Sequence, residues 1–134
     1  MTRGRIESIS PFFVVTNVSQ TIAFYREKLG FETAYQEPMA DPFFAIVRRD
    51  MAMIFLKHGG APPMPNPLRS PSMKWDAYVY VPDPDALAAE FAGNSLTLHK
   101  PLMNTSENLR GFEVRDPDGY VLFFGRPEQA PNPR

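Results

Sequence analysis

The apolar residues of the first half of the chain predict a strand followed by a helix. Residues 9–16 are apolar and rich in Phe and Val, which is typical of a buried strand. Asn17 or Ser19 can cap the helix that follows, where apolar residues recur at helical spacing. Gly30 is expected just beyond the last turn, because glycine readily takes the left-handed conformation that ends many helices.

The second half of the chain shows the same pattern again. Residues 75–81 alternate like a strand, Asp83 is a helix cap, and Pro84 suits the first helical position. Gly93 is expected to stop this helix. The two predicted caps, Asn17 and Asp83, lie 66 positions apart, which indicates an internal duplication and not a solenoid repeat.

Three further strand-like segments follow each predicted helix. In the first half they are residues 31–37, 43–49 and 51–57, and in the second half residues 95–102, 111–116 and 120–125. The order β-α-β-β-β therefore occurs twice, which predicts an α+β fold with the helices on one face of each sheet.

We accordingly expect residues 1–134 to form a single domain. Its parts are a module over about 6–58, a Pro-rich linker over 59–72, a second module over about 73–127, and a flexible tail over 128–134.

The composition excludes several classes of function. The 134 residues carry a net charge of −1, so nothing indicates a nucleic-acid or membrane partner. The absence of cysteine removes disulfides and thiolate metal sites and fits a cytoplasmic protein. No signal peptide is visible, and no apolar run approaches the roughly 20 residues that span a bilayer.

Two motifs identify a family resemblance that covers about residues 6–127. FYREKLGFE (24–32) after the first strand and DPDGYVLFF (116–124) at the last strand resemble the vicinal oxygen chelate superfamily. This superfamily includes glyoxalase I, extradiol dioxygenases, and the bleomycin- and fosfomycin-resistance proteins. The resemblance implies two βαβββ modules that curl around a cleft, and it implies a homodimer.

The resemblance also implies where a metal ion would be bound. Enzymes of this superfamily usually hold a divalent ion with His, Gln or Glu side chains from the first and last strands of each module. On this sequence those positions are Ser10, Phe55, Asp76 and Phe123. Phenylalanine cannot coordinate a metal and serine is a poor ligand, so we expect no metal and no cofactor.

Aromatic side chains at these positions predict a ligand-binding cleft with apolar walls. Because side chains alternate across a strand, residues two apart share a face with the lost ligands. The predicted ligand-binding residues are Phe12, Arg48, Met53, Phe55, Trp75, Asp76, Tyr78, Tyr80 and Phe123. Such a cleft suits a flat, partly aromatic molecule. Two alternatives stay open: the rings fill the cavity themselves, or they pack in a dimer interface.

Asp76 is the candidate catalytic residue. A carboxylate among apolar groups can act as a general base or hold a cationic group of the ligand. The alternatives are a salt bridge to Arg48 or Lys57 or simple exposure to solvent. His58 and His99 match no ligand spacing and are expected to be solvated loop residues.

The sequence therefore favours a metal-free, bleomycin-resistance-like protein that binds a small, partly aromatic molecule, with drug sequestration as one such role. It leaves open an enzyme of the same superfamily, such as a lyase, an isomerase or a dioxygenase-like protein. That enzyme would use Asp76 or displaced metal ligands.

Overall fold

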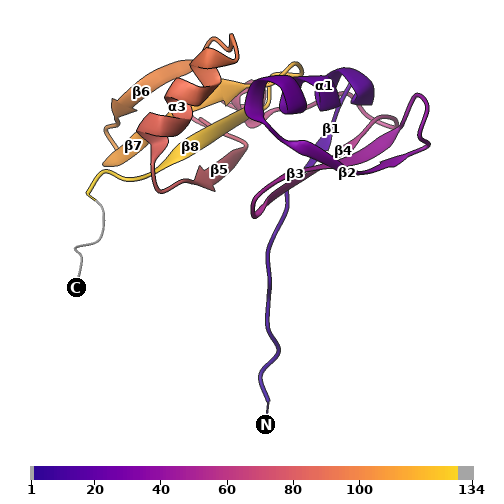
Figure 1. Cartoon of the computed structure of the whole chain (residues 1–134), viewed down its shortest axis with the longest axis horizontal. Helices are drawn as coiled ribbons and strands as arrows, with labels where there is room; N and C mark the ends of the chain where they lie inside the picture. The colour runs from indigo at the N-terminus through magenta and orange to yellow at the C-terminus, as the bar shows by residue number, and fades with distance from the viewer. Residues whose placement is uncertain (1, 130–134) are drawn as a thin grey trace.

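The computed structural model describes residues 2–129 and contains two four-stranded mixed sheets, each with one long helix (Figure 1). The predicted α+β fold is confirmed. The first, N-terminal module consists of β1 (Phe12–Val14), α1 (Val18–Leu29), β2 (Glu32–Glu37), β3 (Phe44–Arg49) and β4 (Ala52–Lys57). The second, C-terminal module consists of β5 (Ala77–Tyr80), α3 (Pro84–Gly93), β6 (Lys100–Asn104), β7 (Leu109–Arg115) and β8 (Val121–Pro127).

The two sheets have the same topology. The strand order is β1-β4-β3-β2 in the first sheet and β5-β8-β7-β6 in the second. Among the described strands, β1 and β4 are the only parallel pair of the first sheet, and β5 and β8 are the only parallel pair of the second. Both helices lie along the same side of the sheets (Figure 1). Neither of these two long helices covers the other side of the sheets.

The predicted helix ends are confirmed at three of four positions. Asn17 caps α1 by accepting a 3.0 Å hydrogen bond from the Gln20 amide, and Asp83 caps α3 in the same way. Gly30 follows α1 with φ 73°, the left-handed conformation that was expected. Gly93 instead lies within α3, and the left-handed residue after this helix is Ser95, with φ 64°.

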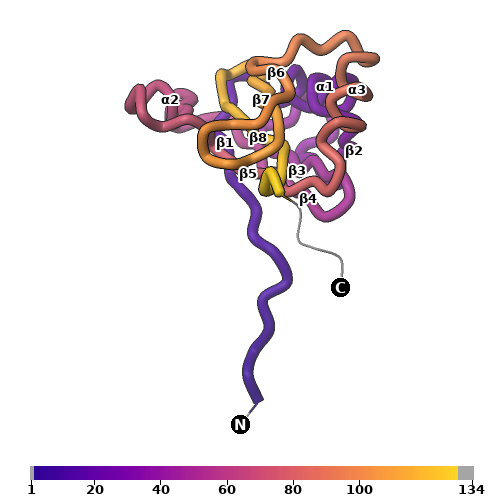
Figure 2. Tube along the Cα trace, turned by 90° about the vertical axis from the view of Figure 1, so that its left-hand side faces the viewer, coloured from indigo at the N-terminus to yellow at the C-terminus, as the bar shows by residue number. Residues whose placement is uncertain are grey.

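Two loop predictions need correction. The expected strand over 95–102 begins only at Lys100, because the chain turns through Ser95 first. Pro101 has no amide hydrogen to donate, and the β6/β7 register shifts beside it. The Pro-rich linker is not wholly irregular, since residues Asn66–Arg69 form a short helix, α2, which projects from the body of the molecule (Figure 2).

The chain before β1 runs away from the two modules (Figure 2). Ile6 and Ile9 in this segment are 90% and 95% exposed. No helix of the described residues is both long enough and apolar enough to cross a membrane.

The two modules meet along a seam on the helix side of the sheets. The rings of Phe13 and Tyr120 stack with their centroids 4.2 Å apart, and the Tyr120 hydroxyl donates to the Val14 carbonyl at 2.8 Å. The hydroxyl of Tyr25 in α1 donates to the carboxylate of Asp116, the first residue of the DPDG turn, at 3.0 Å. The DPDG turn thus connects the C-terminal module to the first helix.

Lys28 and Asn94 extend this seam through reciprocal hydrogen bonds. The Lys28 ammonium donates to the Asn94 carbonyl at 3.2 Å, and the Asn94 side-chain amide donates to the Lys28 carbonyl at 3.0 Å. These residues lie 66 positions apart, the same offset as the two helix caps.

Candidate ligand-binding site

The sheet face of the N-terminal module that lies opposite α1 carries a cluster of aromatic rings. Phe55 pairs with Phe12 on one side and with Ile46 on the other, so their side chains share this face. The centroid of the Phe55 ring lies 5.9 Å from those of Phe12 and Phe44, and Tyr35 lies 6.1 Å from Phe44. Phe12 is 56% exposed, so the cluster is open to solvent.

The corresponding face of the C-terminal module carries a tighter stack. The Phe123 ring stacks with Trp75 at 4.9 Å and with its strand neighbour Tyr78 at 5.6 Å, and it is almost fully buried. It lies over Gly111 and Gly125, since a Cβ added to Gly111 would come within 2.6 Å of Phe123 Cζ. The two glycines therefore make room for a ring that lies close against the sheet.

Phe55 and Phe123 occupy equivalent places in the two sheets. Each lies on the central strand that pairs in parallel with the first strand of its module, opposite Phe12 or Tyr78. Phe55 and Phe123 are therefore counterparts in the two modules. Their rings offer no donor atom to a divalent ion, so the side chains at these positions do not fit one. Among residues 2–129, no group of three or more His, Asp or Glu side chains is placed to hold a metal ion.

Asp76 is held by main-chain amides. One carboxylate oxygen accepts a 2.6 Å hydrogen bond from the amide of Asn66, the first residue of α2, and the other accepts a 2.8 Å bond from Val121 at the start of β8. Asp76 therefore fixes the Pro-rich loop to the last strand. Ser10 lies outside β1 and is half-buried.

Arg48 does not reach Asp76. Its guanidinium forms an exposed 2.9 Å ion pair with Glu32 on the neighbouring strand, and its register partner on β4 is Met53. Within the described part of the chain Asp76 forms no ion pair, so the expectation of a salt bridge to Arg48 or Lys57 is wrong.

The nine predicted ligand-binding residues divide between the two modules. Phe12, Arg48, Met53 and Phe55 belong to the first, and Trp75, Asp76, Tyr78, Tyr80 and Phe123 to the second. Every ring contact among the described members of this set lies within one module. Tyr80 lies at the far end of β5 and is 59% exposed. One chain therefore presents two aromatic faces, where the sequence predicted one cleft.

Sequence reasoning missed Glu113. This residue lies on β7 directly opposite Phe123 and next to Lys100 on β6, yet it is only 5% exposed. Burial raises the pKa of its carboxyl, while the charges of Lys100, His99 and Lys74 and a hydrogen bond from the Trp75 side chain lower it by less. The available signal was the apolar context, since Glu113 lies between Phe112 and Val114 in a predicted strand, where a charged residue is unusual.

The described residues also line two cavities, one near the aromatic faces and one on the helix side. One of about 400 Å³ lies between β1 and the Pro-rich loop, and its lining includes Phe12, Met64, Arg69, Asp76 and Tyr120. It is the place where two of the predicted residues, Phe12 and Asp76, come together.

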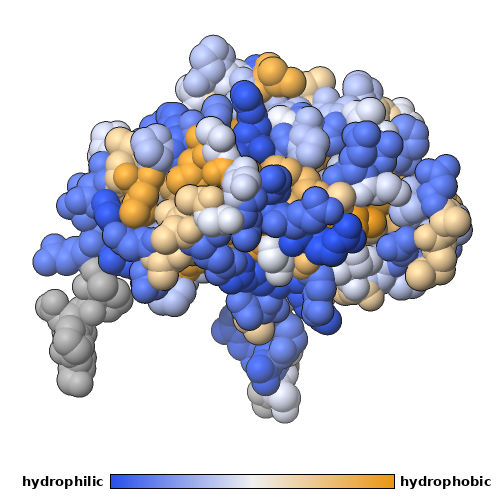
Figure 3. Space-filling model, turned by 45° about the horizontal axis from the view of Figure 1, so that its top comes forward, coloured by the Kyte–Doolittle hydropathy of each residue, from blue (hydrophilic) through white to orange (hydrophobic). Residues whose placement is uncertain are grey.

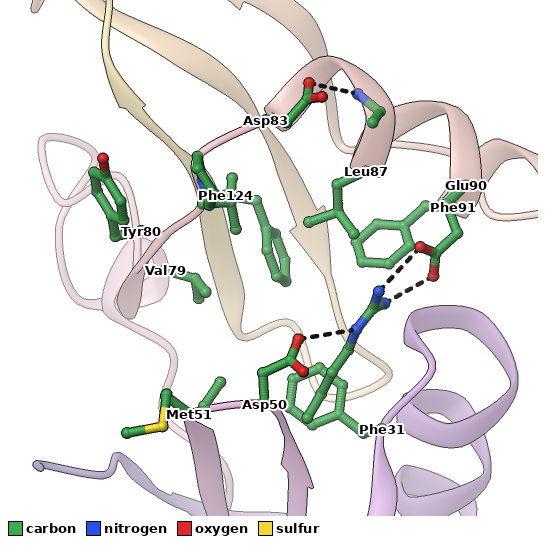
Figure 4. Close-up of a pocket in the computed structure, with 15 residues that line it drawn as sticks. Phe31, Asp50, Met51, Val79, Tyr80, Asp83, Leu87, Glu90, Phe91 and Phe124 are labelled. Carbon is green, nitrogen blue, oxygen red and sulfur yellow. Dashed lines mark hydrogen bonds and ion pairs between the residues drawn. The ribbon is translucent and has the colours of Figure 1, made fainter. Parts of the chain in front are cut away.

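The second cavity, of about 430 Å³, lies on the helix side between α3 and the β3–β4 turn (Figure 4). Arg49 lines it and pairs with both carboxylate oxygens of Glu90, at 2.8 and 3.0 Å. The pair raises the pKa of Arg49 and lowers that of Glu90. Phe91 and Phe124 line its apolar side. Seen toward the helices, the molecular surface is largely polar, with separate apolar patches (Figure 3).

Comparison with known proteins places this geometry in a family. The model of the Glyoxalase/Bleomycin resistance protein/Dioxygenase superfamily matches residues 5–124. No curated protein matches the sequence.

Solved structures share the fold at low sequence identity. TioX from Micromonospora sp. ML1 is 17% identical with a TM-score of 0.71, over 90% of this chain and 98% of that one. The bleomycin-binding protein of Streptomyces verticillus, solved with copper(II)-bleomycin, is 24% identical with a TM-score of 0.68, over 91% and 97%. A glyoxalase-related enzyme from Clostridium phytofermentans is 14% identical with a TM-score of 0.69, over 91% and 95%. The fold therefore includes both binding proteins and enzymes.

Proposed function

Because the chain belongs to the Glyoxalase/Bleomycin resistance protein/Dioxygenase superfamily, we propose that it binds a small, flat, partly aromatic molecule without a metal ion. The observation that carries this proposal is that Phe55 and Phe123 stand at two of the positions where the family resemblance implies metal ligands. Both rings belong to clusters whose outer members, Phe12 and Tyr78, face solvent. Stacked and offset rings attract a planar ligand and remove its apolar area from water.

A flat molecule is covered on both sides only if two aromatic faces oppose each other. Each module of one chain presents a single such face, directed away from the helices. We therefore propose a homodimer in which the N-terminal face of one copy lies opposite the C-terminal face of the other. Exposed apolar side chains on both faces support this arrangement. They are Phe12, Tyr35, Tyr78, Tyr80 and Met103.

We propose sequestration as the role of this site. Bleomycin-binding proteins of similar fold bind a drug, and the aromatic faces of this chain supply contact area more than reactive groups. The alternative enzyme with Asp76 as base gains no support from the geometry, because both oxygens of Asp76 accept bonds from main-chain amides.

Trp75 provides a direct test because it is the single tryptophan of the chain. Titration with the flat probe quinolin-2-one should change its emission, after correction for absorbance by the probe. Tyr78→Ala should weaken binding about fivefold, since an aromatic pair contributes about 1 kcal/mol. Phe43→Ala is the control: Phe43 is 46% exposed, like Tyr78 at 40%, but alternation directs it away from this face.

Metal analysis of protein purified without chelator accompanies the titration and should find no stoichiometric divalent ion. The proposal would be contradicted if the protein contained stoichiometric metal. It would also be contradicted if neither quinolin-2-one nor any other flat aromatic probe changed the emission of Trp75.

A further inference from the structure

Both modules form the walls of the cavity of about 430 Å³ on the helix side (Figure 4). The N-terminal module contributes Phe31 and the β3–β4 turn, and the C-terminal module contributes parts of β5, α3 and β8. Leu87, Phe91 and Phe124 direct their side chains into this space (Figure 4). A cavity of this volume with mostly apolar walls is typical of small-molecule sites. An apolar ligand that displaces water from these walls is bound by the hydrophobic effect.

Arg49 connects the two modules at the edge of this cavity. Its Nη1 donates to the Leu29 carbonyl at the end of α1 and to a carboxylate oxygen of Glu90 in α3, both at 2.8 Å. Its Nη2 donates to the other Glu90 oxygen at 3.0 Å, and its guanidinium carbon lies 6.0 Å from the centroid of the Phe91 ring. Because these contacts join one helix of each module, the walls are in place before a ligand binds, which lowers the cost of binding.

The charged residues of the lining leave an excess of negative charge. Arg49 and Glu90 neutralise each other, so the excess comes from Asp50 and Asp83. The Asp50 side chain is 90% exposed, and its carboxylate lies 3.9 Å from Arg49 Nε. One oxygen of Asp83 accepts from the Ala86 amide at 3.1 Å, and the described residues donate no hydrogen bond to the other. The lining therefore attracts a cation more than an anion.

We propose that this cavity is a second binding site, separate from the aromatic faces, and that it takes an amine with a bulky apolar body. The body lies against Leu87, Phe91 and Phe124, and the ammonium group lies toward the excess negative charge of Asp50 and Asp83. A carboxylate ligand is disfavoured because the same two acids repel it, while Glu90 already occupies the guanidinium of Arg49. The cavity lies on the helix side, so it stays accessible in the proposed dimer, whose contact uses the other side of the sheets.

Two matched probes separate the amine from its apolar body. 1-Adamantylmethylamine and 1-adamantylmethanol share a rigid hydrocarbon cage, which is not flat and therefore does not stack on rings as a planar ligand does. The amine is positively charged at pH 7, and the alcohol is neutral. Isothermal titration calorimetry should show that the wild-type protein binds the amine about fivefold more tightly or better, an effect of the size that exposed ion pairs give.

A double substitution attributes this preference to the two acids. Asp50→Asn combined with Asp83→Asn removes both charges, yet asparagine tolerates the left-handed conformation of residue 50, with φ 51°, and caps a helix as well as aspartate does. The ratio of the two affinities should fall to about one, chiefly because the amine binds more weakly. Asp41→Asn is the control: Asp41 is exposed and left-handed with φ 50°, but it does not line the cavity, so the wild-type ratio should remain.

A substitution in the wall tests the cavity itself. Ala86 is an exposed lining residue of α3, so Ala86→Phe places a ring in the cavity without entering the core. It should weaken both probes at least about tenfold, because the ring occupies the space of the hydrocarbon cage. Ala92→Phe, at an exposed position of α3 outside the lining, should leave both affinities unchanged.

The outcomes decide the site and the ligand class separately. If neither probe binds the wild-type protein, or if Ala86→Phe binds both as tightly as the wild type, the cavity is not a binding site. If the two probes bind equally, or if the double variant still prefers the amine, the assignment of an amine is wrong. Quinolin-2-one should change the emission of Trp75 equally with and without the adamantyl amine, so a failure at one site is distinguishable from a failure at the other.

Discussion

Asp116 shows how one residue can serve both a turn and the contact between the modules. One of its oxygens accepts from the amides of Asp118 and Tyr120, at 2.9 and 3.0 Å, and the other accepts from the Tyr25 hydroxyl. Burial raises the pKa of Asp116 to about 6, against the lowering effect of these three hydrogen bonds. The seam therefore contains a group that titrates just below neutral pH.

The stability of the protein should depend on pH through Asp116. Its carboxyl has a higher pKa in the folded state than in the unfolded state, so the folded state binds its proton more tightly. The stabilising effect of that proton is complete below about pH 4 and is lost as the pH rises through about 6. Relative to Asp116→Asn, the wild type should lose about 3 kcal/mol of unfolding free energy between about pH 3 and pH 7.

Denaturant unfolding at several pH values measures this difference, and all other titrating groups are common to both proteins. Parallel pH profiles for the wild type and Asp116→Asn would show that burial does not shift the pKa of Asp116 as described.

Single residues differed in how far the sequence could place them. Phe55 and Phe123 were predictable because each strand position follows from a motif and from alternation. Glu113 was not, because alternation alone cannot tell whether a charged residue faces solvent or a covered ring. The bonds of Asp76 to Asn66 and Val121 were also hidden, since they depend on how a proline-rich loop folds back.

At the scale of single strands, β7 and β8 make room for the Phe123 ring because two paired positions on these strands carry no side chain. Gly111 and Gly125 are register partners, and the Phe123 ring covers both. A side chain at either position would meet the ring and the main chain of the facing strand. These two glycines therefore set the depth at which the aromatic stack lies.

Gly111→Ala should destabilise the protein by about 1–3 kcal/mol, the usual cost of overpacking, because the new methyl group meets Phe123 and the strand behind it. In a Phe123→Leu background the cost should be smaller by about 1 kcal/mol, since the ring is gone but the main-chain contact remains. Chemical denaturation of the four proteins in this double-mutant cycle gives the coupling.

Gly4→Ala is the control for this cycle, because nothing lies within 4 Å of the added group. A zero coupling between positions 111 and 123 would mean that the ring does not lie over the glycine.

The elements themselves were largely predictable because their signals are local. Caps at Asn17 and Asp83 and the glycine after α1 mark helix ends through side-chain and backbone chemistry. The start of β6 was not predictable, because pairing of the residues between Ser95 and Pro101 depends on the partner strand β7 and on the missing amide hydrogen of Pro101. The helix α2 was hidden for a related reason, since proline-rich sequence normally indicates irregular chain.

At the scale of the molecule, the arrangement of two open aromatic faces governs assembly. Both faces lie on the side of the sheets away from the helices, and their outer residues are partly exposed. The sequence could predict the duplication and the aromatic character of the faces. It could not predict their separation within one chain, because the relative placement of modules depends on contacts such as the Phe13–Tyr120 stack between distant segments.

We expect the protein to sediment as a dimer at micromolar concentration. Phe12→Lys places a charge on the N-terminal aromatic face and should raise the dimer dissociation constant at least about tenfold, and it should weaken binding of quinolin-2-one in parallel. Met51→Lys, at an 85% exposed position of the β3–β4 turn, should leave both unchanged. Analytical ultracentrifugation across a concentration series decides this, and a wild-type protein that stays monomeric throughout would refute the dimer.

The reciprocal hydrogen bonds of Lys28 and Asn94 have a geometrical meaning. These residues are counterparts in the two repeats, and each donates to the carbonyl of the other. In a symmetric assembly of identical subunits, a residue meets its own equivalent only beside the two-fold axis. The seam therefore reproduces, inside a single polypeptide, the contact that two identical subunits would make across a two-fold axis, so the two modules are related to each other as the halves of a symmetric dimer would be.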